Sequence, residues 1–190
     1  LFADLQYRYV NYKSDGVNDN YVSAEVGMQP IDVDKQYHFF NPRAGVSYTL
    51  AERNNFYFSF AVAQKEPTRS DFTDRYMFAE ANTYPSSEKL YDYELGYQYT
   101  APRLSLGVNL YYMKYKDQLV PTGRINDGYD ALNDNVADSY RRGVELSAAW
   151  RATGWFTVGA NATFSQNRIE NYVHRVVDYG QTGNVAGEYG

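Results

Sequence analysis

Hydrophobic and polar residues alternate along seven stretches of this chain. Residues 40–50 are typical: Phe40 and Val46 fall on one face of an extended strand, and Asn41 and Arg43 fall on the other. The remaining stretches cover residues 1–9, 56–63, 91–100, 104–113, 140–150 and 156–165. Alternation with a period of two indicates β-strands that have one apolar and one polar face. The pattern therefore predicts an all-β fold.

The connections between these strands alternate in length. Short turns are expected at residues 51–54, 101–103 and 151–154. Long polar segments cover residues 12–37, 64–89 and 121–138, and a polar tail begins at residue 168. Antiparallel hairpins with short turns at one end of the sheet and long loops at the other explain this arrangement. Long loops are usually functional or disordered.

The residue types on the apolar face distinguish a membrane-spanning sheet from a soluble β-sandwich. Arg142 is its only charged residue, and it lies near the long-loop end, from which an arginine side chain reaches water. Aliphatic residues such as Val46 and Leu95 occupy the middle, with Phe58 and Phe60 as exceptions. Two aromatic girdles are predicted, one toward the long loops (Tyr9, Phe40, Tyr91, Tyr93, Tyr112, Tyr140) and one toward the short turns (Tyr48, Phe56, Tyr97, Tyr99, Trp150, Phe156). The two interfaces of a bilayer select such banding, and a sandwich core does not.

Strand length and strand count both point to a larger barrel. At about 3.3 Å per residue and about 45° tilt, residues 40–50 span roughly 25 Å, the height of the apolar band of an outer-membrane barrel. Backbone groups must all be paired in hydrocarbon, so a membrane sheet has to close, and seven strands leave two open edges. The pattern predicts an antiparallel, up-and-down transmembrane β-barrel, with residues 1–190 as a segment of one domain.

Glycines recur on the polar face of the predicted strands, at Gly45, Gly96, Gly107, Gly143 and Gly159. A glycine within a strand marks a bend or the close approach of another group. On a curved sheet we expect these positions to serve curvature and spacing rather than contact with a plug inside the barrel.

Composition narrows the function classes. The chain has 190 residues, a net charge of −5, no cysteine and 21 tyrosines. Its mean hydropathy of −0.62 and short apolar runs exclude a helical membrane span, and this stretch carries no secretory signal. The acidic balance argues against nucleic acid as a partner. Without cysteine there are no disulfides, no thiolate metal sites and no thiol catalysis.

Three stretches resemble the barrel of TonB-dependent outer-membrane receptors. They are FAVAQKEPT at residues 60–68, EKLYDYELGY at residues 88–97 and RGVEL at residues 142–146. Their order and spacing together resemble this family from the first strand to the last. Residues 85–88 depart from it, because they lack the usual Lys-Pro-Glu.

The resemblance implies a barrel of about 22 strands that is plugged by an N-terminal domain. It also implies import of a scarce, bulky nutrient, most often an iron–siderophore complex, across the outer membrane of a Gram-negative bacterium. Energy would come from the TonB complex, which grips a short N-terminal motif. Plug and motif are expected outside residues 1–190. The implied partners are outer-membrane lipid, the TonB complex and a small-molecule chelate, and neither a cofactor nor an enzymatic activity is implied.

Candidate ligand-binding residues fall in one long loop and on the polar face. The loop residues are Lys65, Arg69, Arg75, Tyr76 and Tyr84, and the residues of the polar face are Tyr57, Tyr111, Arg141 and Glu145. Cations mixed with aromatic rings suit an anionic, aromatic chelate, through ion pairs and cation–π contacts. Ordinary solvation of the loop and of a polar lumen explains the same residues, so both interpretations stay open.

No residue pattern indicates catalysis or a resident metal. His38 and His174 are far apart in sequence, and no nucleophile–base pair or carboxylate pair stands out. Asn126–Asp130 and Asn133–Asn135 carry oxygen ligands but miss the spacing of an EF-hand loop. Two other functions remain open: a passive porin-type barrel, and a soluble carbohydrate-binding or adhesive β-domain.

Overall fold

A computed structural model describes residues 1–18, 29–73, 84–125, 131–170, 172, 174–177 and 185–189. The elements are β1 (Phe2–Asn18), β2 (Gln29–Leu50), β3 (Asn54–Lys65), α1 (Arg69–Thr73), β4 (Glu88–Ala101), β5 (Leu104–Ile125), β6 (Ala131–Arg151), β7 (Thr157–Ile169), β8 (His174–Val177) and β9 (Val185–Tyr189). Within these ranges, no helix is long and apolar enough to cross a membrane.

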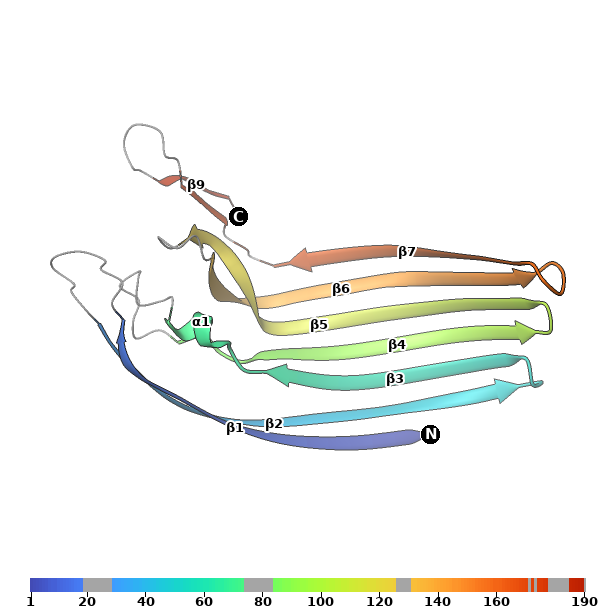
Figure 1. Cartoon of the computed structure of the whole chain (residues 1–190), viewed down its shortest axis with the longest axis horizontal. Helices are drawn as coiled ribbons and strands as arrows, with labels where there is room; N and C mark the ends of the chain where they lie inside the picture. Colours follow the sequence, from blue (N-terminus) through green and yellow to red (C-terminus); the bar gives the residue numbers. More distant parts are fainter. Residues whose placement is uncertain are drawn as a thin grey trace.

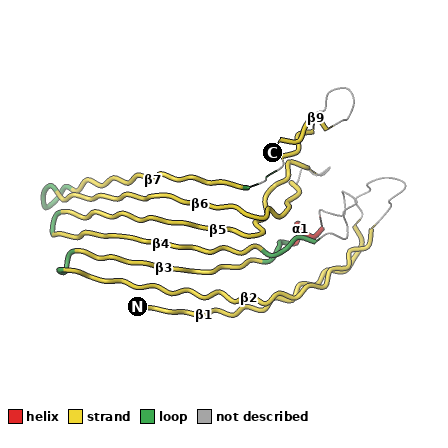
Figure 2. The backbone as a smooth tube through the Cα atoms, turned by 180° about the vertical axis from the view of Figure 1, so that it is seen from behind, coloured by secondary structure: helices red, strands yellow, loops and turns green. Residues whose placement is uncertain are grey.

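Strands β1 to β7 form one antiparallel sheet in chain order, as the alternation predicts. Figure 1 shows the short turns together at one end of the sheet, with α1 and the β8–β9 hairpin at the other. The view from behind in Figure 2 shows the same division between the two ends. In the described part of the chain, β1 and β7 are the edge strands of this sheet.

Two of the long connections consist largely of paired strands. β1 and β2 stay in register as far as Asn18 and Gln29, and β5 and β6 pair as far as Ile125 and Ala131, with a register shift between Pro121 and Ile125. Both extensions project beyond β3 and β4, at the end opposite the short turns (Figure 1). They are named here as the β1–β2 arm (residues 10–18 and 29–38) and the β5–β6 arm (residues 117–125 and 131–137).

The prediction of long loops over residues 12–37 and 121–138 is wrong where the arms run. A two-stranded ribbon beyond the sheet can carry polar residues on both faces, as Lys13, Ser14 and Asp15 do in β1. Such a ribbon lacks the alternation that reveals a strand with one buried face.

The apolar residues of β2 to β7 share one face, called the outer face. Direct register places one row across these six strands: Val46, Phe58, Leu95, Leu110, Val144 and Phe164. Leu95 is 52% exposed and Phe164 is 66% exposed. An exposed apolar surface of this extent needs an apolar environment, which lipid supplies to a membrane barrel.

Glycines on the opposite, inner face make room for side chains of the neighbouring strand. The cross-strand pairs are Phe2 with Gly45, Tyr57 with Gly96, and Tyr111 with Gly143. A Cβ at Gly96 would overlap the ring of Tyr57. At Gly143 it would lie 2.6 Å from the Tyr111 Oη and 2.5 Å from the Phe164 carbonyl oxygen. These positions therefore need glycine because an aromatic ring of the neighbouring strand occupies the space that a Cβ would take.

The most buried side chains lie at the end of the sheet that carries the arms. Phe72 of α1 and Val33 of the β1–β2 arm are almost fully buried, and Leu132 of the β5–β6 arm is 2% exposed. Figure 1 places α1 between the two arms. This small core is called the cap.

Candidate functional site

A chain of hydrogen bonds crosses the inner face. The Tyr57 hydroxyl on β3 donates to Asn109 Oδ1 on β5 at 3.0 Å, reaching over Gly96 on the strand between them. The Asn109 amide then donates to Glu145 Oε2 on β6 at 3.3 Å. Tyr57 and Glu145, both predicted from the sequence, therefore lie in one row, and Asn109 joins them.

A hollow of about 450 Å³ opens at this row. Its polar lining comes from the inner face and includes Tyr57, Gln98, Asn109, Glu145 and Ser147. Hydroxyl, amide and carboxylate groups accept and donate hydrogen bonds, so this surface can hold water, a polar ligand or a donor-rich protein segment.

The other two candidates of the inner face have partners of their own. Tyr111 packs beside Gly143 on the next strand. The Arg141 guanidinium lies over the ring of Tyr115, 5.3 Å from its centroid. Asp92, on the same face, has a buried Oδ1 without a hydrogen-bond partner among the described residues.

The loop candidates fall into three groups. Lys65 and Arg69 are exposed at the end of the sheet that carries the arms. Arg75 and Tyr76 lie outside the described residues. Tyr84 is half-buried: its hydroxyl donates to the Asp32 carbonyl at 3.2 Å, which attaches the loop to the β1–β2 arm.

Asp71 fixes the start of α1 and ties it to the β5–β6 arm. Its Oδ2 accepts hydrogen bonds from the Thr68 backbone N–H and hydroxyl, both at 2.7 Å, as in a capping box. Its Oδ1 accepts from the Asn133 amide at 2.9 Å. Asp71 is 4% exposed, so these bonds satisfy a carboxylate that is costly to bury alone.

Phe72 attaches the other side of α1 to the β1–β2 arm. Its ring stacks on Tyr12 at 4.8 Å between centroids and contacts Tyr84 at 5.8 Å. The Lys35 ammonium lies 4.9 Å from the Tyr84 ring centroid. The cap thus holds both arms and the loop between β3 and β4 in one packed unit.

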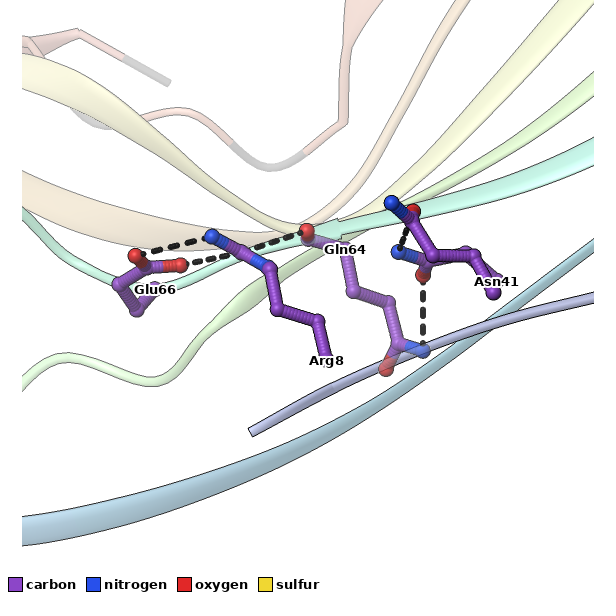
Figure 3. A network of polar contacts seen from close by, with 5 residues as sticks. Arg8, Asn41, Gln64 and Glu66 are labelled. Atoms are coloured by element: carbon purple, nitrogen blue, oxygen red, sulfur yellow. Dashed lines mark hydrogen bonds and ion pairs between the residues drawn. The ribbon is translucent and has the colours of Figure 1, made fainter. Parts of the chain in front are cut away.

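Arg8 on β1 closes the inner face against the end of β3, as Figure 3 shows. Its guanidinium donates to both carboxylate oxygens of Glu66, in one case at 3.1 Å, and to the Gln64 carbonyl at 3.3 Å. The same guanidinium lies 4.9 Å from the Phe39 ring centroid. This group is called the Arg8 clasp.

The clasp sets the protonation of Glu66, which lies beyond the end of β3. Partial burial of its carboxylate disfavours ionisation, but its own backbone N–H and the Arg8 guanidinium favour it more strongly. The pKa of Glu66 is consequently lowered from its usual 4.5. Glu66 is ionised at neutral pH.

The Arg8 clasp lies beyond the point where the backbone pairing between β2 and β3 ends. β2 and β3 pair from Leu50 and Asn54 only as far as Arg43 and Ala61, although both strands continue. Pro42 follows directly and has no N–H to give to a ladder. Beyond this point side chains bridge the gap, which is called the seam.

Gln64 makes the bridge on the β3 side of the seam. Its side-chain amide donates to the Phe40 carbonyl at 2.8 Å. It also donates to Asn41 Oδ1 at 3.4 Å (Figure 3). A single side chain therefore replaces the ladder bonds that β2 would otherwise make here.

The predicted girdle residues share the outer face, but their contact with a bilayer stays a prediction. Tyr9, Tyr48 and Trp150 are exposed, and Tyr97 is half-buried, with its hydroxyl donating to Asn54 Oδ1 at 2.8 Å. Arg142 donates twice to Gln166 Oε1, at 2.9 and 2.7 Å.

Sequence reasoning missed the partners that join these residues. Asn109 falls on the polar face of the alternating stretch 104–113, so the sequence pattern could have identified it as a candidate. Asp71 and Asn133 lie in segments that were interpreted as loop, and no pattern links them. The described residues hold no group of three or more metal-ligating side chains.

Three solved structures illustrate the fold. The copper transporter OprC matches with a TM-score of 0.71 and 15% identity, over 88% of this chain and 27% of its own. The iron transporter FrpB of Neisseria meningitidis (F3-3 variant) has a TM-score of 0.61 and 19% identity, over 88% and 23%. The siderophore receptor PirA of Pseudomonas aeruginosa has a TM-score of 0.59 and 16% identity, over 87% and 32%. The chain thus spans about a quarter to a third of each.

A comparison with curated proteins gave no match. The family model for a "TonB dependent receptor-like, beta-barrel" matches residues 1–188. This family consists of receptors and transporters of the Gram-negative outer membrane rather than of enzymes. The match excludes the alternative of a soluble carbohydrate-binding or adhesive β-domain. The chain belongs to the TonB-dependent receptor-like β-barrel family.

Proposed function

We propose that this chain is part of the wall of an outer-membrane receptor that imports a bulky, metal-containing nutrient, with an iron–siderophore complex as the first candidate cargo. The observation that carries the proposal is the family match over residues 1–188. Solved structures of similar fold are described as copper, iron and siderophore transporters or receptors, which favours a metal-containing cargo.

The cap is the place where cargo first meets this part of the protein. It lies at the end of the sheet that carries the arms, and Lys65 and Arg69 are exposed there. Cationic side chains attract an anionic chelate, and nearby tyrosine rings can stack on its aromatic groups. Arg75, Tyr76 and Tyr84 belong to the same proposed binding loop.

The inner face then lines the route and faces a plug domain that would precede the barrel. The Tyr57–Asn109–Glu145 row offers hydrogen-bonding groups along the wall. The unpartnered Asp92 Oδ1 suits an N–H donor of the plug, since a buried carboxylate oxygen without a partner is costly. Tyr111 and Arg141 lie on the same route. A TonB complex that pulls on the region before the barrel supplies the energy.

Uptake of radiolabelled cargo tests the proposal. A strain that lacks the gene is complemented with the full-length protein and offered iron–siderophore complexes, copper, cobalamin and glycans. We expect uptake of a metal-containing cargo that stops when TonB is deleted or the proton gradient is collapsed. Uptake that continues without TonB would instead mean a passive, porin-type barrel.

Charge at the cap provides a second test. The Lys65→Gln and Arg69→Gln double variant is expected to raise the cargo Kd by about tenfold, because each exposed ion pair contributes up to about 1 kcal/mol. The matched control exchanges Arg53 and Arg103, which lie at the short turns, for glutamine. Equal affinity of both variants for the cargo would place recognition outside the cap.

A further inference from the structure

We propose that Asp71 is a positioning residue for cargo binding, which acts through Arg69. Its buried carboxylate ties α1 to the β5–β6 arm and thereby fixes the place of the Arg69 cation at the cap. The inference deepens the proposed function and rests on it, because Arg69 is one of the two exposed cations proposed to meet the cargo. Asp71 itself is 4% exposed, so its carboxylate cannot serve as a cargo contact.

The two cations of the cap are held in different ways. Lys65 is the last residue of β3 and pairs with Glu88 in the β3–β4 ladder, so the sheet fixes its backbone. Arg69 is the first residue of α1, a helix of five residues. A helix of this length has too few internal hydrogen bonds to be stable on its own. The position of Arg69 therefore depends on the contacts that α1 makes with its surroundings.

Asp71 makes the polar contacts of α1. Its Oδ2 accepts from Thr68, just before the helix, and its Oδ1 accepts from the Asn133 amide at 2.9 Å. Both oxygens of a buried carboxylate are thus satisfied, and the loss of either partner leaves one of them without a hydrogen bond, which is costly. Because Asn133 belongs to the β5–β6 arm, α1 cannot shift away from this arm without that cost.

The same arm also holds the far end of the connection between β3 and β4. The Asn135 side chain accepts from the Ser86 N–H at 2.7 Å and donates to the Ser86 carbonyl at 3.1 Å, as a neighbouring strand would. Its amide also donates to the Asp117 carbonyl at 2.6 Å, at the point where the arm leaves the sheet. The β5–β6 arm therefore binds the connection both at Asp71 and at Ser86.

The contacts of α1 with the β1–β2 arm are apolar and do not involve Asp71. Phe72 is fully buried, stacks on Tyr12 at 4.8 Å and contacts the Tyr84 ring at 5.8 Å between centroids. Figure 1 shows α1 between the two arms. The helix thus has a polar attachment to one arm and an aromatic attachment to the other. Removal of the polar attachment should release Arg69, while Phe72 keeps the helix near the sheet.

Exchange of the hydrogen-bonding partners tests the inference in the full-length protein. Asn133→Asp places a second carboxylate against Asp71 and breaks the attachment by repulsion. Asp71→Asn combined with Asn133→Asp restores it in reverse, because the amide at position 71 then donates to the carboxylate at position 133. Asn11→Asp, at an exposed position of the β1–β2 arm, is the control for the added charge.

Calorimetry at pH 8 measures the Kd of the cargo that uptake identifies, with an iron(III) tris-catecholate complex as the first probe. Without further changes, Arg69→Gln and Lys65→Gln should each raise the Kd about threefold. Together with Asn133→Asp, Arg69→Gln should change the Kd less than about 1.5-fold, whereas Lys65→Gln should still raise it about threefold. The reversed pair should restore the effect of Arg69→Gln, and Asn11→Asp should retain it.

Spin labels report the position of α1 without any cargo. Residues 1–190 contain no cysteine, so Ser70→Cys on α1 and Arg53→Cys at the β2–β3 turn give a defined pair of labels. We expect a narrow distance distribution in the unaltered protein and in the reversed pair, and a clearly broader one in Asn133→Asp. If Asn133→Asp fails to form a barrel, judged by the gel mobility of the unheated protein, Asn133→Ala replaces it with the same expected results.

Three results would overturn the inference. An undiminished effect of Arg69→Gln in the presence of Asn133→Asp would mean that Arg69 is held without Asp71. An unchanged label distribution would mean that α1 stays in place. Loss of the Lys65→Gln effect together with that of Arg69→Gln would mean general disruption of the cap. A failure of the proposed function shows separately, because the unaltered protein would then take up and bind no metal-containing cargo.

Discussion

The two faces of the same seven strands are built in different ways. On the inner face, side chains fit their neighbours: Tyr57 lies beside Gly96 and donates to Asn109 across a strand. On the outer face, aromatic rings contact other aromatic rings. Phe60, Tyr93, Tyr112 and Tyr140 form a ladder of rings with centroid distances of 4.9, 6.3 and 6.2 Å.

The difference shows that the inner face depends on shape and the outer face on its surroundings. An inner position tolerates polarity but not added volume beside a ring. An outer position tolerates a change of shape but not charge. The same kind of substitution should therefore have different effects on the two faces.

The largest effect is expected for Leu95→Arg, in the middle of the apolar row. A cation at the midplane of a barrel's lipid face costs about 2–4 kcal/mol of the free energy of unfolding. Gln98→Arg, on the inner face of the same strand, should change it by less than about 0.5 kcal/mol. Unfolding in urea from lipid vesicles measures both, and similar losses would contradict the assignment of the faces.

The next effect is expected for Gly143→Ala. The new Cβ would meet the Phe164 carbonyl oxygen and the Tyr111 hydroxyl, so the free energy of unfolding should fall by about 1–3 kcal/mol. Gly154→Ala is the control, because a Cβ at Gly154 has nothing within 4 Å. The same urea titration compares them, and equal stability would mean that the inner face is not tightly fitted.

A smaller effect is expected for Tyr57→Phe. The variant keeps the ring beside Gly96 but removes the hydrogen bond to Asn109, which should cost about 1 kcal/mol. Tyr48→Phe on the outer face is the matched control, with an expected change of less than about 0.5 kcal/mol. If the control loses more stability than Tyr57→Phe, the hydrogen-bonded row does not stabilise the wall.

The smallest effect concerns the Arg8 clasp and acid. The pKa of Glu66 is lower in the folded protein than in the unfolded chain, so the clasp stabilises the fold above pH 4.5 and this contribution disappears as pH falls through the lowered pKa. For a partly exposed pair the loss should stay below about 1 kcal/mol. Urea midpoints across that range should show a step that Glu66→Gln removes and that Asp138→Asn, in the exposed Lys114–Asp138 pair, retains.

Alternation predicted the sheet wherever one face of a strand is apolar and the other polar. Residues 40–50 and 104–113 were recognised as strands for that reason, whereas the arms were not recognised because polar residues occupy both of their faces. Parity alone placed Tyr57 and Glu145 on one face, but the strand register brings Asn109 between them. The Asp71–Asn133 and Arg8–Glu66 contacts join residues 62 and 58 positions apart, and no local pattern encodes such contacts.

The seam between β2 and β3 has an evolutionary consequence. Residues 43–45 of β2 pair with both β1 and β3, residues 46–50 pair with β3, and residues 29–42 pair with β1 alone. Insertions, deletions and substitutions in the β1–β2 arm leave the β2–β3 ladder in register. The β1–β2 arm can thus accept changes of length and sequence that the register of β2 with β3 does not tolerate.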